Sequence, residues 1–389
     1  MRNLNCFNRL IATLCITLFS HTVFGQMNNA DPIPVIHVAD LYHPHGDPDD
    51  HWDLATIYSQ AFQGDIELKA ILIDYTLRNH YVPDVMGVAQ MNRLTGLAVP
   101  VMVGSPYPMQ TTGDIQPGAS IADHSGINMI LDILRSADRP VIIHVVGHSR
   151  DIAIAGKKSP ELFAEKCAGI YLNAGTALGI NNDYNVNLDP VAFSAIFDLP
   201  CPVYWAPCVQ ENYEGQERKR KGEYSTWFSV REKEILTDIP PGTQKFIAYM
   251  YRHGRFQEQE KQYDGDWVSY LDRPVEKDVI EEHAKRTTVG WPLSKPTSER
   301  KHREMWCTPG FLHAAGKTVT KDGQIVSLDS GYPGVFTFEP VQLEVEAPRE
   351  IKWSQDTGVK DRYIFRITDM ENYETAMGRA FMTLLKQLP

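Results

Sequence analysis

The sequence predicts an α/β protein with a doubly wound, mainly parallel central sheet and helices on both faces. Up to about residue 207, apolar runs of strand length alternate with segments of helical period. Several runs are apolar almost throughout, such as 141–146, which is typical of strands buried on both faces. Strands that alternate with helices usually form a parallel sheet with crossover helices, which predicts this fold class.

The elements follow in order along the chain. We expect strands at 33–40, 67–74, 99–104, 140–147, 167–174 and 201–207. We expect helices between them, near 52–62, 82–96, 120–136, 149–157 and 189–198. Strands at 334–346, 350–353 and 362–368 and an amphipathic helix at 371–387 would complete one domain that spans 26–389. The segment 210–305 is rich in charged and aromatic residues and predicts a lid or insertion over the strand ends, or else a peripheral packing insertion.

The N-terminus has the pattern of a signal peptide. Arg2 and Arg9 precede an apolar run at 10–19, and small residues lie before Gln26. The run is too short to cross a membrane, so we expect cleavage after residue 25 and no membrane span in the mature form. The mature protein would be exported, either periplasmic or secreted.

Charge and cysteine content exclude several classes of function. The chain has a formal net charge of -11, which becomes -13 when 1–25 is removed, because that segment carries two arginines and no acid. A protein this acidic is a poor nucleic-acid binder. The basic run 218–221 lies among glutamates and indicates a solvated loop. The cysteines outside the signal (Cys167, Cys201, Cys208 and Cys307) show neither a disulfide framework nor a zinc spacing.

An acidic loop follows the first expected strand. It contains Asp40, Asp47, Asp49 and Asp50, immediately before a helix. Ligands of open α/β sheets bind at the carboxyl ends of the strands. One aspartate could simply cap the helix, but four exceed what capping requires. Because clustered carboxylates repel each other, a cation or a hydroxyl-rich ligand is expected between them.

Two further segments follow strands at the same edge. The stretch 173–190 is dense in amides and carboxylates, which suit sugar hydroxyls, although such residues also dominate turns. Asp189 and Pro190 alone fit the N-cap and first position of a helix. In 146–153, Gly147 allows close approach of a ligand to the backbone. His148, Ser149 and Asp151 are too close in sequence for a catalytic triad to be favoured.

This order of motifs resembles the inosine–uridine nucleoside hydrolase superfamily over nearly the whole mature chain. The resemblance rests on the acidic loop, the glycine turn at 147, the Asn-x-Asp-Tyr-Asn run at 181–185 and the strand and helix at the C-terminus. It is nearest to divergent, exported branches of that superfamily. It implies a nucleoside-hydrolase-like α/β fold and a calcium-dependent site for a glycoside.

The resemblance also implies roles for individual residues. Asp50 would bind Ca²⁺ in a bidentate manner, Asp49 would meet ribose hydroxyls and the carbonyl of Val146 would be a further calcium ligand. The sugar would be held by Asn181, by Asp183 in place of the more common glutamate, by Asn185 and by Asn79 of the loop after the second strand.

Two departures from the family pattern leave alternatives open. The first loop is longer than in the family, so both Asp40 and Asp47 are candidates for its early acids, as calcium ligands or as the proton acceptor. The late His-Asp-Pro motif is replaced by Cys307-Thr308-Pro309, in which Thr308 is the candidate ligand.

The sequence therefore predicts an exported, glycoside-cleaving hydrolase with a metal-activated water and an oxocarbenium-like transition state. Asp40, Asp47 or Asp49 would accept a proton, and His148, His313 or a tyrosine of 210–305 would assist the leaving group. The partner would be a small-molecule glycoside or oligosaccharide, and a homo-oligomer stays open. The alternatives are a catalytically degenerate carbohydrate- or nucleoside-binding protein on the same fold and an interaction module of a cell-surface assembly.

Overall fold

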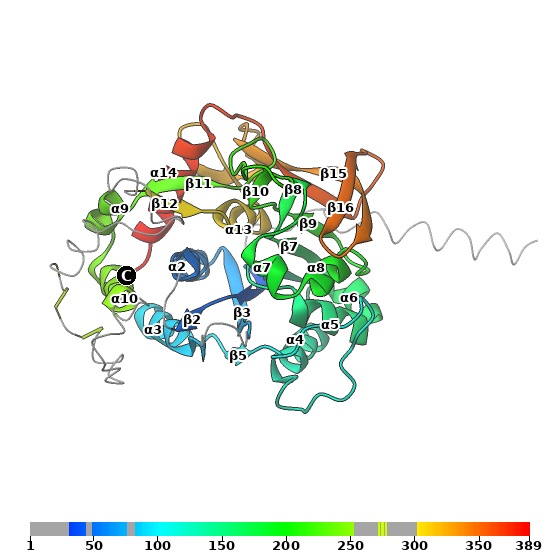
Figure 1. The fold of residues 1–389 in the computed structure, drawn as a ribbon. Helices are drawn as coiled ribbons and strands as arrows, with labels where there is room; N and C mark the ends of the chain where they lie inside the picture. The colour runs from blue at the N-terminus through cyan, green and yellow to red at the C-terminus, as the bar shows by residue number, and fades with distance from the viewer. Residues whose placement is uncertain are drawn as a thin grey trace, which may run out of the picture. The chain divides into compact units, whose positions relative to one another are not determined.

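A computed structural model describes residues 31–43, 49–75, 82–252, 271–272, 274–275, 277 and 302–389. Their elements lie in one compact unit, Ile33–Pro389, built on a nine-stranded sheet (Figure 1). The strand order is β16-β15-β17-β9-β7-β6-β1-β3-β5. The bounds are β1 Ile33–Ala39, β3 Ile66–Ile73, β5 Val101–Val103, β6 Val141–Val145, β7 Cys167–Leu172, β9 Val203–Trp205, β15 Phe336–Ala347, β16 Glu350–Gln355 and β17 Arg362–Ile367.

The sheet is mainly parallel, as predicted. Every neighbouring pair from β5 to β17 is parallel, whereas β15 runs antiparallel to both β17 and β16. From β1 the chain proceeds to β3 and β5 on one side, and β6, β7 and β9 follow on the other. The order therefore reverses beside β1, and its carboxyl end is the topological switch point at which open α/β sheets bind ligands.

Helices cover both faces of the sheet (Figure 1). One face carries α2 (Asp49–Phe62), α13 (Thr308–Ala314) and α14 (Tyr373–Lys386), with α3 (Val85–Thr95) and α10 (Pro241–Arg252) packed against α2. The other face carries α4 (Ser125–Ser136), α5 (Arg150–Lys158), α6 (Pro160–Lys166) and α8 (Pro190–Ile196). The predicted fold class is confirmed.

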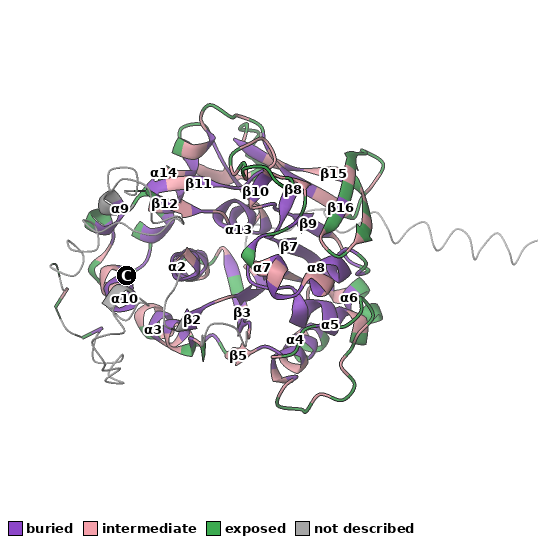
Figure 2. Cartoon of the chain, viewed as in Figure 1, coloured by how far each residue is buried: buried purple, intermediate pink, exposed green. Residues whose placement is uncertain are grey.

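Strand alternation produces two hydrophobic cores. In β1, Val35 and Ala39 pack into the core beneath α2 and α14, whereas Ile36 and Val38 pack into the core beneath α4 and α5. Figure 2 shows the resulting burial of the central strands and of α2. Because both faces are covered, a continuous apolar run is the pattern that such a strand requires.

The remaining elements form small sheets and connections. The two-stranded sheets are β2 (Tyr42–His43) with β4 (Val82–Pro83), β8 (Thr176–Gly179) with β10 (Val209–Asn212), β11 (Phe228–Arg231) with β12 (His302–Met305) and β13 (Lys317–Val319) with β14 (Ile325–Ser327). Short helices are α7 (Tyr184–Leu188), α9 (Glu232–Asp238) and the 3-10 turn η2 (Leu328–Ser330).

The predicted elements match these bounds to within a few residues, and α2 begins at Asp49, earlier than the expected start near 52. The predicted signal peptide, together with much of the expected lid at 210–305, lies outside the described residues. In the part of the chain that is described, no helix has the length and apolarity needed to span a bilayer.

Candidate functional site

The candidate site lies at the carboxyl ends of the central strands. Asp40 follows β1, Asp74 follows β3 and Asn173 follows β7. Backbone hydrogen bonds hold these strand ends together, from the N–H of Asp74 to the carbonyl of Ala39 (3.0 Å) and from that of Asn173 to Val145 (2.9 Å). Residues distant in sequence therefore converge on the switch point.

Two carboxyl groups meet at the centre of the site. Asp50, in the first turn of α2, is buried and shares a hydrogen bond with Asp40. Burial, and then repulsion by Asp40 and Asp49, raises the pKa of Asp50 well above its ordinary value. A hydrogen bond between two carboxyl groups requires a shared proton, so this pair can hold one proton or bind a cation in its place.

A thiol adjoins this pair. Cys307, at the N-terminus of α13, donates its S–H to the buried carboxylate of Asp53, which lies one helical turn after Asp50. Burial raises the pKa of Asp53 to about 7, although the thiol and Arg303 oppose this shift. Next to Cys307, the Oγ1 of Thr308 is buried and has no hydrogen-bond partner in the part of the chain that is described. Such an oxygen is available to a ligand.

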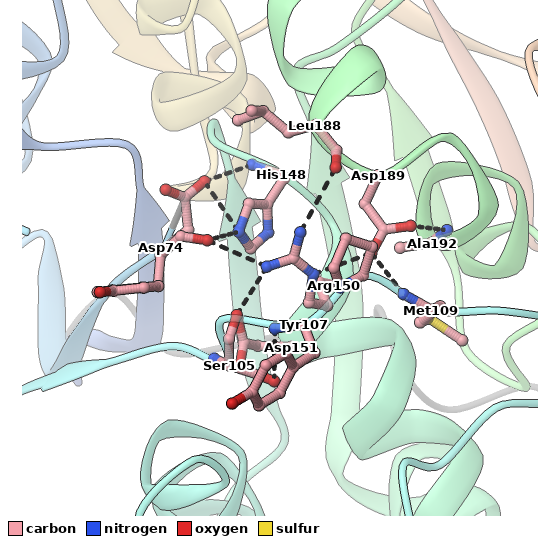
Figure 3. Close-up of polar contacts among 12 residues, drawn as sticks. Asp74, Ser105, Tyr107, Met109, His148, Arg150, Asp151, Leu188, Asp189 and Ala192 are labelled. Carbon is pink, nitrogen blue, oxygen red and sulfur yellow. Dashed lines mark hydrogen bonds and ion pairs between the residues drawn. The ribbon is translucent and has the colours of Figure 1, made fainter. Parts of the chain in front are cut away.

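A second buried network surrounds Asp74 (Figure 3). Its carboxylate accepts the hydroxyl of Tyr42 and the backbone N–H of His148 (2.6 Å). The Nε2 atom of His148 lies 3.1 Å from the carbonyl oxygen of Tyr75 and 3.8 Å from Asp74 Oδ2. Burial and the neighbouring Asp40 raise the pKa of Asp74, while burial and Arg150 lower the pKa of His148. His148 is thus neutral at pH 7.

A buried ion pair supports this network (Figure 3). The Nε of Arg150 donates to Asp189 Oδ2 over 2.9 Å, and both side chains are at most 2% exposed. Other donors of Arg150 bind the carbonyl oxygens of Tyr75 (3.0 Å) and Ser105 (2.7 Å). Arg150 therefore ties the ends of β3 and β5 to the start of α8.

The three residues expected to hold a sugar lie together in the connection after β8. Asp183 caps α7, and its oxygens accept the N–H groups of Gly175 and Val186. Asn181 bonds only backbone groups among the described residues. Asn185 differs, because its Nδ2 donates to the carbonyl of Val146 over 2.6 Å while its buried Oδ1 has no partner within the described ranges. Of the three, Asn185 has the amide oxygen that is free for a ligand.

Comparisons with known proteins establish the fold. No family model and no curated protein matches the chain. Among solved structures, the purine-preferring ribonucleoside hydrolase from Gardnerella vaginalis aligns with 90% of this chain and 99% of its own at a TM-score of 0.51 and 17% identity. The chain has the nucleoside hydrolase fold. Two other structures align over 92% of this chain: the inosine-uridine preferring nucleoside hydrolase from Bacillus anthracis (TM-score 0.44, 10% identity, all of its own chain) and the type III effector protein XopQ (0.45, 13%, 94% of its own chain).

Within the nucleoside hydrolase fold, the structure brings together several residues selected from the sequence. Asp40, Asp49 and Asp50 share one edge, and the hydrogen bond from Asn185 links its loop to Val146 at that edge. Asp47 and Asn79 fall outside the described residues, so their roles stay predictions. His313 lies away from the acids, where its Nδ1 bonds the hydroxyl of Tyr171 (2.8 Å).

Sequence reasoning missed Asp74 and the Arg150–Asp189 pair. Asp74 had a usable signal, because it directly follows an apolar strand just as Asp40 does. Asp189 was interpreted only as the cap of α8, which is confirmed by its bond from the N–H of Ala192 (3.0 Å). Nothing local predicts that the same carboxylate also binds a guanidinium 39 positions earlier.

The donor set around the acids suits a hard cation. No cluster of three or more His, Cys, Asp or Glu side chains with metal-binding geometry occurs within the described ranges. The oxygen donors at this edge are the Asp40 and Asp50 carboxylates, the Val146 carbonyl, which also accepts the amide of Asn185, and the Thr308 hydroxyl, which has no partner within the described residues. Oxygen donors of this kind are those that Ca²⁺ prefers, so the residues present are compatible with that ion.

Proposed function

We propose that this protein is an exported hydrolase that cleaves an N-ribosyl or related glycosidic bond with a metal-activated water. The observation that carries the proposal is the hydrogen-bonded Asp40–Asp50 pair at the switch point of a nucleoside hydrolase fold. Two carboxyl groups in contact, of which Asp50 is buried, are costly unless a proton or a cation lies between them. A site of this kind is therefore better explained by ligand binding than by stability.

The residues have distinct parts in this proposal. Asp40 directly follows β1 and Asp49 begins α2, and one of these two carboxylates would accept the proton of the attacking water. The free Oδ1 of Asn185 would accept a sugar hydroxyl. His148 is neutral and its Nε2–H donates to the carbonyl oxygen of Tyr75, so its Nδ1, which has no partner among the described residues, would accept a hydrogen bond from a ligand.

Calcium is the cofactor that this proposal implies. Asp40, Asp50, the Val146 carbonyl and Thr308 would hold it, with Asp47 as a further candidate. When bound, such an ion lowers the pKa of a coordinated water and orients vicinal hydroxyls. Displacing the shared proton from the Asp40–Asp50 pair would make ion binding release a proton near neutral pH.

A second candidate function has a specific observation in its favour. Asp183 and Asn181 use their described hydrogen bonds to fix backbone, and the late His-Asp of the resembling family is replaced by Cys307 and Thr308. A protein with these changes could bind a nucleoside or carbohydrate without turning it over. Hydrolysis and binding must therefore be measured separately.

The test incubates the purified mature protein with a panel of nucleosides and oligosaccharides, with calcium or with EDTA. We expect reducing-sugar release that EDTA abolishes and that Asp50→Asn abolishes. The matched control, Asp329→Asn, makes the same change in an exposed residue of η2 and should keep full activity. A rise in melting temperature with these ligands, without any product, would support the binding protein. Release of reducing sugar by the Asp50→Asn variant would refute the proposed mechanism.

The proposal includes export of the protein, which is tested by identifying the N-terminal residue of the mature chain. The N-terminal residue of the protein isolated from the expressing cell's exported fraction should be Gln26. Retention of 1–25 in the mature protein would contradict it.

A further inference from the structure

The basic loop 218–221 contains one cation that differs from its neighbours. Three side chains in the loop form ion pairs with glutamates: Lys219 with Glu211, Arg220 with Glu304 and Lys221 with Glu374. Within the described part of the chain, Arg218 has no ion pair with a carboxylate. Its Nη2 donates to the carbonyl oxygen of Asn182 over 3.3 Å, and its buried Nε has no acceptor among the residues that the structure describes.

The fold directs this loop to the candidate site. Strand β10, just before it, pairs in parallel with β8, so the loop lies against the connection that carries Asn182 and Asp183. The N–H of Cys208, at the start of β10, bonds the carbonyl of Gly175 over 3.0 Å. Arg218 therefore packs on the connection between β8 and α7, next to Asp183.

Electrostatics agree with this placement. Cys208 is partly buried, and its burial, followed by the charge of Asp183, raises the pKa of its thiol. Arg218 opposes this shift, whereas Asp49 and Asp40 add to it. Burial raises the pKa of Asp183, and Arg218 opposes that shift too, so its guanidinium acts electrostatically on that carboxylate. A guanidinium presents five donors in a planar fork, and among the described residues Arg218 makes one hydrogen bond, from its Nη2.

We infer that Arg218 is a specificity residue that binds an anionic group on the substrate, so that the site selects a glycoside carrying a carboxylate or a phosphate. The inference rests on the proposed function for the identity of the site. Guanidinium forks bind both carboxylate and phosphate through paired N–H donors. The nearby aspartates would repel an anion elsewhere in the site, which confines it to the side of Arg218.

Exposed aromatic side chains near Arg218 could contact the rest of such a ligand. Tyr184, at the start of α7, and Tyr213, after β10, are each more than two-fifths exposed, and both flank the connection between β8 and α7. Aromatic faces stack on sugar rings and on nucleobases. A glycoside with one anionic group would then contact a stacking ring, the acidic edge and Arg218.

The experiment compares matched ligands that differ in one anionic group. The pairs are methyl glucoside with methyl glucuronide, and uridine with uridine 5′-monophosphate. Dissociation constants are measured by calorimetry on the full mature chain, with KM substituted for any member that is hydrolysed. We expect the wild-type protein to prefer the anionic member of at least one pair by about 10- to 100-fold, as for hydrogen bonds to a charged group. The pair that shows the preference identifies the anion as carboxylate or phosphate.

Two variants test whether Arg218 causes the preference for the anionic ligand. Arg218→Met should remove the preference and leave binding of the neutral member within about threefold. The control Lys219→Met makes the same charge change in the same loop, at an exposed residue paired with Glu211, and should keep the preference. If Arg218→Met does not fold, Arg218→Gln replaces it.

The outcomes separate this inference from the proposed function. A preference that Arg218→Met removes supports the inference even when nothing is hydrolysed. Hydrolysis without a preference, a preference that survives Arg218→Met, or binding of none of the four ligands overturns it.

Discussion

The buried Arg150–Asp189 pair gives the sharpest stability prediction. Arg150→Met keeps much of the side-chain volume, removes the charge and leaves Asp189 fully buried without its cation. It also removes the donors to Tyr75 and Ser105. Breaking a buried pair from one side typically costs about 3–5 kcal/mol, because the remaining charge stays out of water.

A matched control is present in the same chain. Arg135 pairs with Asp132 over 2.8 Å, nearly the distance of the buried pair, but these side chains are 55% and 74% exposed. Arg135→Met should therefore cost no more than about 1 kcal/mol. The double variant Arg150→Met with Asp189→Asn removes both buried charges and keeps a side-chain acceptor for the cap of α8. It should recover about 1–3 kcal/mol of the loss.

The assay is urea unfolding at pH 7, followed by tryptophan fluorescence and far-UV circular dichroism. Free energies of unfolding are compared among the wild type, the two single variants and the double variant. Equal losses for Arg150→Met and Arg135→Met would show that burial does not set the strength of the pair. A double variant less stable than Arg150→Met would show that an unpaired Asp189 is not the source of the loss.

Two further predictions concern the acidic edge. Asp53 has a folded-state pKa of about 7, above its unfolded value, so the folded protein binds the extra proton and metal-free stability should fall as pH rises from 4 to 7. Asp53→Asn should reduce that slope by up to about 1.4 kcal/mol per pH unit, measured by urea unfolding in EDTA, and an unchanged slope would contradict the assignment. Gly147→Ala should cost about 1–3 kcal/mol, because its Cβ would lie 2.3 Å from a carboxylate oxygen of Asp74. The control Gly118→Ala has no atom within 4 Å of the new Cβ, and an equal loss in melting temperature for both variants would refute the steric argument.

The sequence predicts the sheet well, because buried parallel strands have a local signature. The continuous apolar run at 141–146 indicated β6, and it required no knowledge of its neighbours. The position of Asp40 followed in the same way, since a carboxylate after such a strand must lie at the ligand-binding edge. These predictions depend only on residues close in the chain.

Pairings between distant segments could not be obtained in this way. The bond from Cys307 to Asp53, the ion pair from Arg150 to Asp189 and the contact from Arg218 to Asn182 each join residues that lie far apart in sequence. Composition correctly showed that the loop at 218–221 lies among glutamates, but not that Arg218 has no such partner among the residues that the structure describes. The number of charged residues gives the net charge of a loop. It does not show which of its side chains forms an ion pair, and ligand binding depends on that.

Gly147 has a consequence for how this protein can diverge. A side chain there would collide with Asp74 and with the backbone of Asp40, so three strand ends meet with no spare volume between them. Single substitutions where these three strand ends meet would therefore not change the substrate specificity without disturbing the fold. Descendants of this chain would acquire different substrates by altering the surrounding connections, while the junction itself is inherited unchanged.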